Sequence, residues 1–174
     1  MLEMKVSGIV LDPQSRSPIV VLRDLDDRRA LLIWIGPPEA NAIMLVLEKI
    51  ELSRPSTHDL MYNILKTLKT PLKSILINDM KDNTFYAQLN LKSNDDEKDI
   101  VIDARPSDAI ALALRAKVPI LVSEKVMLTS SIPINPSQDE EEAEKFKKFI
   151  DNIKPSDFLK MCKNIDTHID EEKE

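Results

Sequence analysis

Two patterns of apolar residues, one typical of strands and one typical of helices, recur along the chain and predict a domain of mixed β and α structure. Short runs rich in Val, Ile and Leu predict strands. These runs cover residues 4–11, 18–23, 30–35, 72–78, 84–91, 100–103 and 118–122. Apolar residues spaced three and four apart predict helices over residues 39–52, 57–69 and 107–117. Most of the turns between these segments contain proline, of which the chain has 11, whereas it has only two glycines.

A unit of three strands and one helix occurs twice. Residues 5–47 align without a gap on residues 72–114 at a constant offset of 67 positions, and nine of the 43 pairs are identical. The identities mark an Ile-x-Ile strand end, a corner with proline and an Ala-Ile-x-Leu-x-Leu helix. We therefore predict an α+β fold, in which a mixed β-sheet built from a duplicated β-β-β-α unit packs against helices. The two strand-to-helix corners should be related by a pseudo-two-fold axis.

The net charge of −6 is concentrated at the end of the chain. Residues 136–174 hold 12 acidic and 7 basic residues, so the preceding part is close to neutral. We predict a domain over residues 1–128, a Ser/Pro-rich linker over 129–138 and an acidic helical tail over 139–174. A near-neutral domain lacks the broad basic surface of a tight nucleic-acid binder, although a local basic groove is compatible with it.

Composition excludes several classes of protein. Gly8 and Gly36 alone cannot form a Gly-rich phosphate loop. A single cysteine, Cys162, allows no intramolecular disulfide and fits a reducing compartment. No apolar run approaches the roughly 20 residues of a membrane span, and the first residues lack the pattern of a secretory signal. We therefore expect a cytoplasmic protein without membrane contact.

The first candidate for chemistry lies at a predicted helix start, in the sequence Arg54-Pro55-Ser56-Thr57-His58-Asp59. A histidine beside a carboxylate can act as a general base, a proton shuttle or a metal ligand. Asp59 would then orient His58, and Arg54 would bind phosphate. The alternative is structural: Ser56 and Asp59 form a capping box, and His58 is a surface residue without a role.

The second candidate is the corner Asp103-Ala104-Arg105-Pro106-Ser107-Asp108. Two carboxylates close to a guanidinium suit a divalent metal ion and a bound phosphate. In the alternative, Ser107 caps the helix, Asp108 complements the helix dipole and Arg105 pairs with Asp103. That alternative accounts well for Ser107 and Asp108, but it gives Asp103 and Arg105 no required task.

The corner of the first unit, Gly36–Asn41, is poorer in charged groups. The offset of 67 places Asn41 opposite Asp108. Glu39 is either an acid that complements the helix dipole or a third carboxylate of a shared site. Helix N-termini at all three candidates would favour phosphate if they converged. Because each carries its own acid, such a site would need Mg²⁺ or Mn²⁺ to bind an anion.

Aromatic residues are expected in the core or in hairpin packing. Trp34 lies in an unbroken apolar strand, a pattern that predicts burial on both faces. Phe85 and Tyr86 follow a turn and are more typical of hairpin packing than of base-stacking platforms. The helix over residues 39–52 is apolar on every side near its centre, so it is either central or covered by a second subunit.

Four stretches of the sequence, in their order and spacing, resemble the bifunctional nuclease family of bacteria and plants. They are Leu31–Ala40, Arg54–Leu60, Asp82–Ala87 and Asp103–Ala113, within residues 3–128. The family usually has proline where this chain has Leu32, and the acidic tail is similar to that of bacterial members. The resemblance implies an α+β domain, a homodimer or higher homo-oligomer, and DNase and RNase activity. It assigns no role to individual residues.

We therefore predict a nuclease that hydrolyses phosphodiester bonds of DNA or RNA with Mg²⁺ or Mn²⁺. The metal ligands would be Asp103, Asp108 and Glu39, the catalytic residues His58, Asp59 and Arg105, and the phosphate-binding residues Arg54, Arg105 and Ser107. The alternative is a non-catalytic module that binds a small anion or a protein partner at the same corners. The near-neutral charge and the capping explanations favour the module, whereas the four motifs favour the nuclease.

Overall fold

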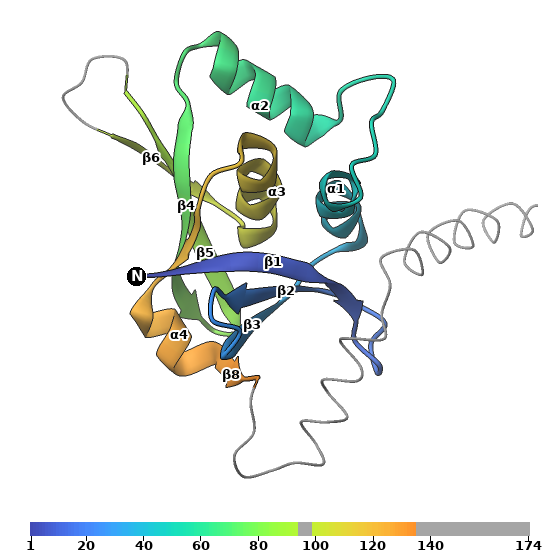
Figure 1. Ribbon diagram of the computed structural model, residues 1–174, viewed down its shortest axis with the longest axis vertical. Helices are drawn as coiled ribbons and strands as arrows, with labels where there is room; N and C mark the ends of the chain where they lie inside the picture. The colour runs from blue at the N-terminus through green and yellow to red at the C-terminus, as the bar shows by residue number, and fades with distance from the viewer. Residues whose placement is uncertain (94–98, 135–174) are drawn as a thin grey trace, which may run out of the picture. The chain divides into compact units, whose positions relative to one another are not determined.

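A computed structural model describes residues 1–93 and 99–134, and their elements repeat one pattern (Figure 1). The first unit contains β1 (Leu2–Leu11), β2 (Pro18–Asp24), β3 (Arg29–Trp34) and α1 (Pro37–Leu47). After the connecting helix α2 (Thr57–Thr67), the second unit contains β4 (Leu72–Lys81), β5 (Thr84–Leu91), β6 (Ile100–Ala104) and α3 (Pro106–Ala116). The chain continues through β7 (Ile120–Val122), α4 (Glu124–Ser130) and β8 (Ser131–Pro133). The predicted α+β fold with a duplicated β-β-β-α unit is confirmed, whereas the predicted helical tail lies outside the described residues.

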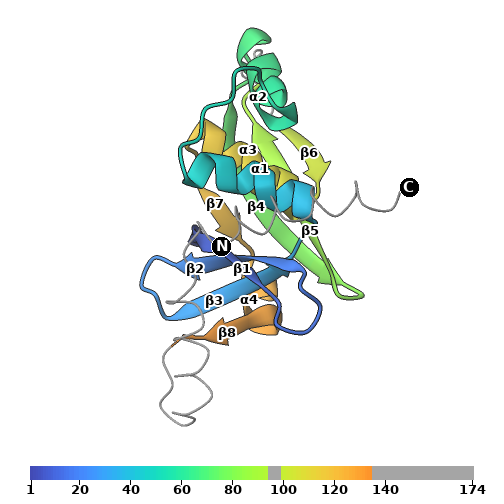
Figure 2. The ribbon, with the colours of Figure 1, turned by 90° about the vertical axis from the view of Figure 1, so that its right-hand side faces the viewer.

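The strands of the described ranges form one mixed sheet in the order β6-β5-β4-β7-β1-β2-β3-β8. Each unit contributes an antiparallel meander of three strands. Between the two meanders lies β7, which is antiparallel to β1 and parallel to β4. The sheet is strongly curled, so that β1, β2 and β3 cross the direction of β4 and β5 (Figures 1 and 2). This curl brings together the ends of β3 and β6, from which α1 and α3 start.

The helices α1 and α3 lie side by side against the sheet and form most of the core with it (Figure 2). In α3 the stretch Ala109–Ala113 is entirely buried. Alanines alternate there with larger residues, so α3 can approach α1, β4 and β5 closely. In α1, Ile43 and Met44 are buried but Leu45–Leu47 is only half-buried. The central helix of the domain is therefore α3 rather than α1.

Three helices end near a lysine in the left-handed backbone region. The φ angles of Lys49, Lys69 and Lys117, which follow α1, α2 and α3, are 55°, 56° and 55°. Glycine usually takes this position, but a lysine there places its charge near the negative end of the helix dipole. The reversal at Lys49 ends α1 at Leu47 rather than at the predicted Leu52.

The predicted burial of Trp34 is wrong, because 54% of this residue is exposed. In β3 the residues Leu31 and Ile33 are buried in the core, so the alternation of the strand puts Trp34 on the opposite face. Its Nε1 donates a hydrogen bond to Oδ2 of Asp12 at 3.0 Å. The indole is therefore held at the surface at the end of β3.

The compact unit extends further along the chain than the sequence predicts. Residues 129–133, which were expected in a linker, belong to α4 and β8. The short strand β8 pairs antiparallel with β3 and adds to that edge of the sheet. The described part of this unit ends at Ile134, directly after β8. No helix in the described ranges is long and apolar enough to cross a membrane.

Candidate functional site

The helices α1, α2 and α3 begin close together, and the first residues of each contribute to one polar cluster. The equivalent helices α1 and α3 start at Pro37 and Pro106, a difference of 69 positions rather than the 67 of the gap-free alignment. The structure therefore places Glu39, and not Asn41, opposite Asp108. Both acids are the third residue of their helix, where the positive end of the helix dipole stabilises a carboxylate.

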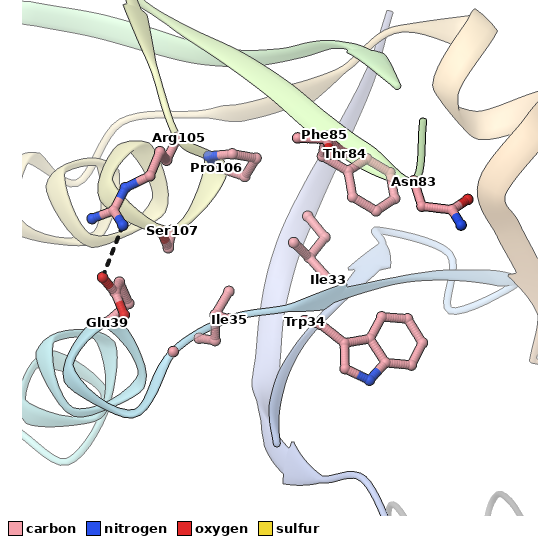
Figure 3. Close-up of a pocket in the computed structure, with 11 residues that line it drawn as sticks. Ile33, Trp34, Ile35, Glu39, Asn83, Thr84, Phe85, Arg105, Pro106 and Ser107 are labelled. Carbon is pink, nitrogen blue, oxygen red and sulfur yellow. Dashed lines mark ion pairs between the residues drawn. The ribbon is translucent and has the colours of Figure 1, made fainter. Parts of the chain in front are cut away.

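The guanidinium of Arg105 joins these two carboxylates, and its ion pair with Glu39 is drawn in Figure 3. Its Nη1 lies 3.0 Å from Oε1 of Glu39. Its Nε and Nη2 donate to Oδ2 and Oδ1 of Asp108 at 2.7 and 3.1 Å. Hydrogen bonds and charge from Asp108, with a smaller contribution from Glu39, raise the pKa of Arg105. The Arg105 side chain is nevertheless 65% exposed, so the site presents an accessible cation in a fixed orientation.

Gly36, the counterpart of Arg105 in the first unit, leaves room for this bridge. Each of the two residues immediately precedes its helix. A Cβ added at position 36 would overlap Oε2 of Glu39, because that side chain folds back over the start of its own helix. The backbone at Gly36 has a φ of −77°, so it is the missing side chain and not backbone freedom that matters here.

His58, the second residue of α2, also contacts Asp108, across 50 positions of sequence. The distance from Nε2 of His58 to Oδ1 of Asp108 is 3.0 Å, and His58 is only 9% exposed. Burial opposes ionisation of Asp108, but hydrogen bonds from Arg105 and His58 outweigh it and lower the pKa of Asp108. An ionised carboxylate can only accept hydrogen bonds, so the hydrogen must be on Nε2 of His58. In the neutral ring, Nδ1 then keeps its lone pair.

Asp59 does not contact His58 through any hydrogen bond within the described residues. Its Oδ2 accepts from the backbone N–H and the Oγ of Ser56 at 2.8 and 2.7 Å, as the capping alternative predicts. Its Oδ1 lies 2.6 Å from Nε of Arg115. Burial opposes ionisation of Asp59, but the bonds from Ser56 and Arg115 lower its pKa to about 2. Asp59 therefore fixes the start of α2, whereas Asp108 holds the imidazole.

Arg115 is a residue of this region that the sequence analysis missed. Its side chain is only 6% exposed. Besides Asp59, it binds the backbone carbonyls of Ala42 and Ala111, each at 3.0 Å. One guanidinium thus ties together α1, α2 and α3. The sequence feature that could have identified Arg115 is its position directly after the apolar stretch Ala109–Leu114. A charged residue that follows a buried stretch of helix needs buried partners.

The remaining candidates lie at the edge of the cluster or outside it. Ser107 is buried at the start of α3 and lines a cavity together with Arg105. Asp103 is exposed on β6, and no hydrogen bond or ion pair in the described ranges joins it to Glu39 or Asp108. Arg54 is exposed in the connection between α1 and α2. No group of three or more His, Cys, Asp or Glu residues in the described part could hold a metal ion.

Two cavities flank the Arg105–Glu39 pair. One, of about 430 Å³, contains the histidine and is lined by residues from α1, α2 and the start of α3, including His58, Asp108 and Asn41. The other, of about 440 Å³, lies between the ends of β3 and β6 and the β4–β5 turn (Figure 3). A ligand in either cavity would reach the same guanidinium.

The fold and the cluster together define an α+β domain in which a duplicated unit holds a histidine–aspartate pair and an exposed arginine at converging helix N-termini. The chain belongs to the bifunctional nuclease domain family, whose sequence model matches residues 20–135.

The relatives of the chain fall into a bacterial and a plant group. A protein of Mycobacterium tuberculosis described only as uncharacterized is 40% identical over 164 residues, which are 90% of this chain and 97% of that protein. Bifunctional nuclease 1 of Oryza sativa subsp. japonica is 30% identical over 118 residues, 66% of this chain and 35% of the rice protein. Bifunctional nuclease 2 of Arabidopsis thaliana is 28% identical over 108 residues, 60% of this chain and 32% of its own length. The similarity thus covers about a third of each plant protein.

Proposed function

We propose that the chain is a nuclease that hydrolyses phosphodiester bonds of DNA and RNA at His58, Asp108 and Arg105. The observation that carries this proposal is the 3.0 Å contact between His58 and Asp108 beside an exposed guanidinium. These groups are a base, a residue that holds it, and a cation for phosphate. The names of the plant relatives, bifunctional nucleases, support the same class of reaction.

His58 is the proposed general base. With the hydrogen of Nε2 donated to Asp108, Nδ1 can accept a proton from the attacking water. The ionised Asp108 then stabilises the imidazolium that forms and keeps the ring in one orientation. The leaving oxygen takes its proton from solvent, because in-line displacement places it on the far side of the phosphorus from the attacking water and from His58.

Arg105 is the proposed phosphate-binding residue. A guanidinium can donate two parallel hydrogen bonds to the oxygens of one phosphate. Its single contact with Glu39 is easier to exchange for phosphate than its two bonds to Asp108. The start of α3, with Ser107, would add backbone N–H donors. Arg54 stays a candidate for contact with a longer substrate, since it is exposed on the adjoining connection.

Dependence on Mg²⁺ or Mn²⁺ is a separate part of the proposal. Glu39 and Asp108 supply the carboxylate oxygens that these ions prefer, but both bind Arg105 in this structure. They would hold a cation only after Arg105 has moved onto a phosphate. The exposed Asp103 of β6 is the proposed third ligand, but it would first have to approach them, since no three such residues form a metal site in the described part as it stands. A cation there would neutralise charge on the phosphate.

Hydrolysis of labelled single-stranded DNA and RNA by the purified protein, with and without EDTA, tests this function. We expect His58→Asn and Asp108→Asn each to lower the rate by about 10²–10⁴-fold while the circular dichroism spectrum is unchanged. Asp27→Asn, which removes an exposed carboxylate distant in sequence from the cluster, is the control. A double variant that combines His58→Asn and Asp108→Asn should be inactive. If it hydrolyses the substrates as fast as the wild type, the activity belongs to another site or to a contaminant. Activity that resists EDTA would remove only the metal from the proposal.

The alternative function is a binding module without catalysis, because every charged group of the cluster already has an internal partner. A wild-type protein that binds oligonucleotides or phosphate but cleaves neither DNA nor RNA at any divalent cation concentration would favour the module over the nuclease.

A second copy of the chain is the partner that we propose for the exposed apolar residues of α2 and β6. Large side chains are exposed there, namely Leu60, Met61, Ile64, Ile100, Val101 and Ile102. As the outermost strand of the described sheet, β6 can pair with the same strand of a second copy. Light scattering coupled to size-exclusion chromatography measures the mass, and Val101→Lys should shift a dimer towards monomer.

A further inference from the structure

Trp34 and Phe85 form an aromatic patch that the proposed chemistry does not use. Both residues line the cavity of about 440 Å³ that also contains Arg105 and Glu39. Figure 3 shows the two rings on one side of this cavity and the Arg105–Glu39 pair on the other. Trp34 is 54% exposed, and Phe85 is half-buried. Large aromatic side chains left open beside a cation mark a place where a ligand can stack.

The aromatic patch lies in the middle of a series of adjoining hollows. A cavity of about 490 Å³ beside α4 and β8 shares Trp34, Asn83 and Phe85 with the cavity of Figure 3. The latter in turn shares Arg105 and Glu39 with the cavity that contains the His58–Asp108 pair. A ligand that crossed all three would pass aromatic rings, then a guanidinium, then the proposed base. This order suits a polymer that alternates flat rings with phosphates.

We propose that Trp34 and Phe85 are a nucleobase-binding subsite and that the groove takes nucleic acid in its single-stranded form. The proposal rests on the proposed function, because it leads the strand from this subsite to Arg105 and His58. A base offers its face to an aromatic side chain only when it is unstacked, which a single strand allows and a duplex does not.

The patch is preorganised for stacking. The hydrogen bond from Nε1 of Trp34 to Asp12 fixes the indole, so little conformational freedom is lost when a base binds. The opposite wall comes from the turn between β4 and β5, where Asp82 and Asn83 both have left-handed backbone with φ of 50° and 57°. Such a two-residue turn is a compact connection between strands. Its Asn83 and Thr84 side chains supply an amide and a hydroxyl near the rings that can reach base edges.

Fluorescence of Trp34 tests the subsite directly, because it is the only tryptophan in the chain. The full-length His58→Asn variant, which should not cleave, is titrated with a short single-stranded oligodeoxyadenylate. Two matched probes are an abasic oligonucleotide of the same length and the same oligodeoxyadenylate in a duplex. We expect saturable quenching by the single strand and much weaker quenching by the other two.

Variants of Phe85 then assign the binding energy while Trp34 reports it. Phe85→Leu keeps an apolar side chain but removes the ring, and it should raise the Kd for the single strand by about five- to hundredfold. Phe85→Tyr should restore most of the affinity. Leu25→Ala, at an exposed apolar residue outside the three cavities, should leave the Kd unchanged.

Each of the following results would overturn the subsite. Equal affinity for the abasic and the base-bearing strand would reduce binding to phosphate alone. An unchanged Kd in Phe85→Leu would remove the stacking. Emission of Trp34 that responds to protein concentration, but not to any oligonucleotide, would assign this face to contact between copies.

If oligonucleotides quench Trp34 but the wild-type protein does not hydrolyse them, the subsite stands and the proposed catalysis is wrong. If the wild-type protein hydrolyses them without quenching of Trp34, the proposed catalysis stands and the subsite is wrong.

Discussion

Glu39 and Asp108 occupy the same position in two equivalent helices, and both bind the single guanidinium of Arg105. Each helix brings its acid to its own N-terminus, where the dipole stabilises the charge. The two like charges are therefore held in one cluster by the arginine between them. The two carboxylates can therefore take another cation only when Arg105 has moved away from them.

Removal of Arg105 should turn the cluster into a better cation site. In Arg105→Met the carboxylates of Glu39 and Asp108 lose their shared partner, and their repulsion favours a divalent cation. We expect a lower Kd for Mn²⁺ than in the wild type, measured by titration calorimetry. Arg28→Met, at an exposed arginine in another turn, is the matched control. An unchanged Kd would mean that these two carboxylates hold no cation.

Arg115 should be far more important for stability than its exposed counterparts. Arg115→Met removes the buried guanidinium that binds Asp59 and the carbonyl oxygens of Ala42 and Ala111. Breaking a buried ion pair costs about 3–5 kcal/mol, and we expect the lower end, about 3 kcal/mol, because Asp59 is about a third exposed. Urea unfolding measures the loss. Arg115→Lys should recover only part of it, since one ammonium cannot reproduce the spread of the guanidinium; full recovery would contradict this geometry.

The contribution of Asp59 to stability should disappear in acid. Its pKa in the folded protein is about 2, below the value of about 3.9 expected in an unfolded chain. Stability from this group is therefore fully present above pH 4 and is lost as the pH falls through 2. The Tm of Asp59→Asn should lie below that of the wild type at pH 7, and the difference should shrink as the pH approaches 2. A difference that is constant with pH would contradict the ion pair.

Asp24 should stabilise the β2–β3 turn more than its neighbour Asp26 does. Asp24 is 5% exposed, and its Oδ1 accepts from the backbone N–H groups of Arg28 and Arg29 at 2.7 and 3.1 Å. Asp24→Ala leaves both donors unpaired, which should cost about 1–3 kcal/mol in urea unfolding. Asp26→Ala, in the same turn but with a 71% exposed side chain, should change the free energy of unfolding by less than about 0.5 kcal/mol. Equal losses would show that the turn is fixed by other contacts.

The elements of the two repeated units were predictable because their signals are local, whereas α4 and β8 were not predicted. Apolar runs that end at prolines identify both strand-to-helix corners, and the repeat identifies them as equivalent. The sequence did not predict which residues of the two corners are equivalent. The connections of the two units differ in length, and this difference shifts Asn41 out of register with Asp108. The sequence also did not predict the exposure of Trp34. A strand that buries only one face can have the same run of apolar residues as a strand that buries both faces.

The partners of the site residues were less predictable than the residues themselves. Sequence adjacency favoured Asp59 as the partner of His58, whereas the structure pairs His58 with Asp108 through the packing of α2 on α3. Such a contact depends on the positions of two helices, which no local pattern encodes. Arg115 has the same origin, because Asp59, Ala42 and Ala111, to which it donates, come from three different helices.

The difference between Gly36 and Arg105 gives the groove a direction. Two equal units around a pseudo-two-fold axis would present the same chemistry to a strand running either way. Here one unit brings a guanidinium in contact with the acids of both, and the other brings only the space for it. A strand laid along the three hollows would meet aromatic rings first in one sense and the histidine first in the other. On the proposed binding mode, the duplicated fold would therefore distinguish the 5′ end of a single strand from its 3′ end.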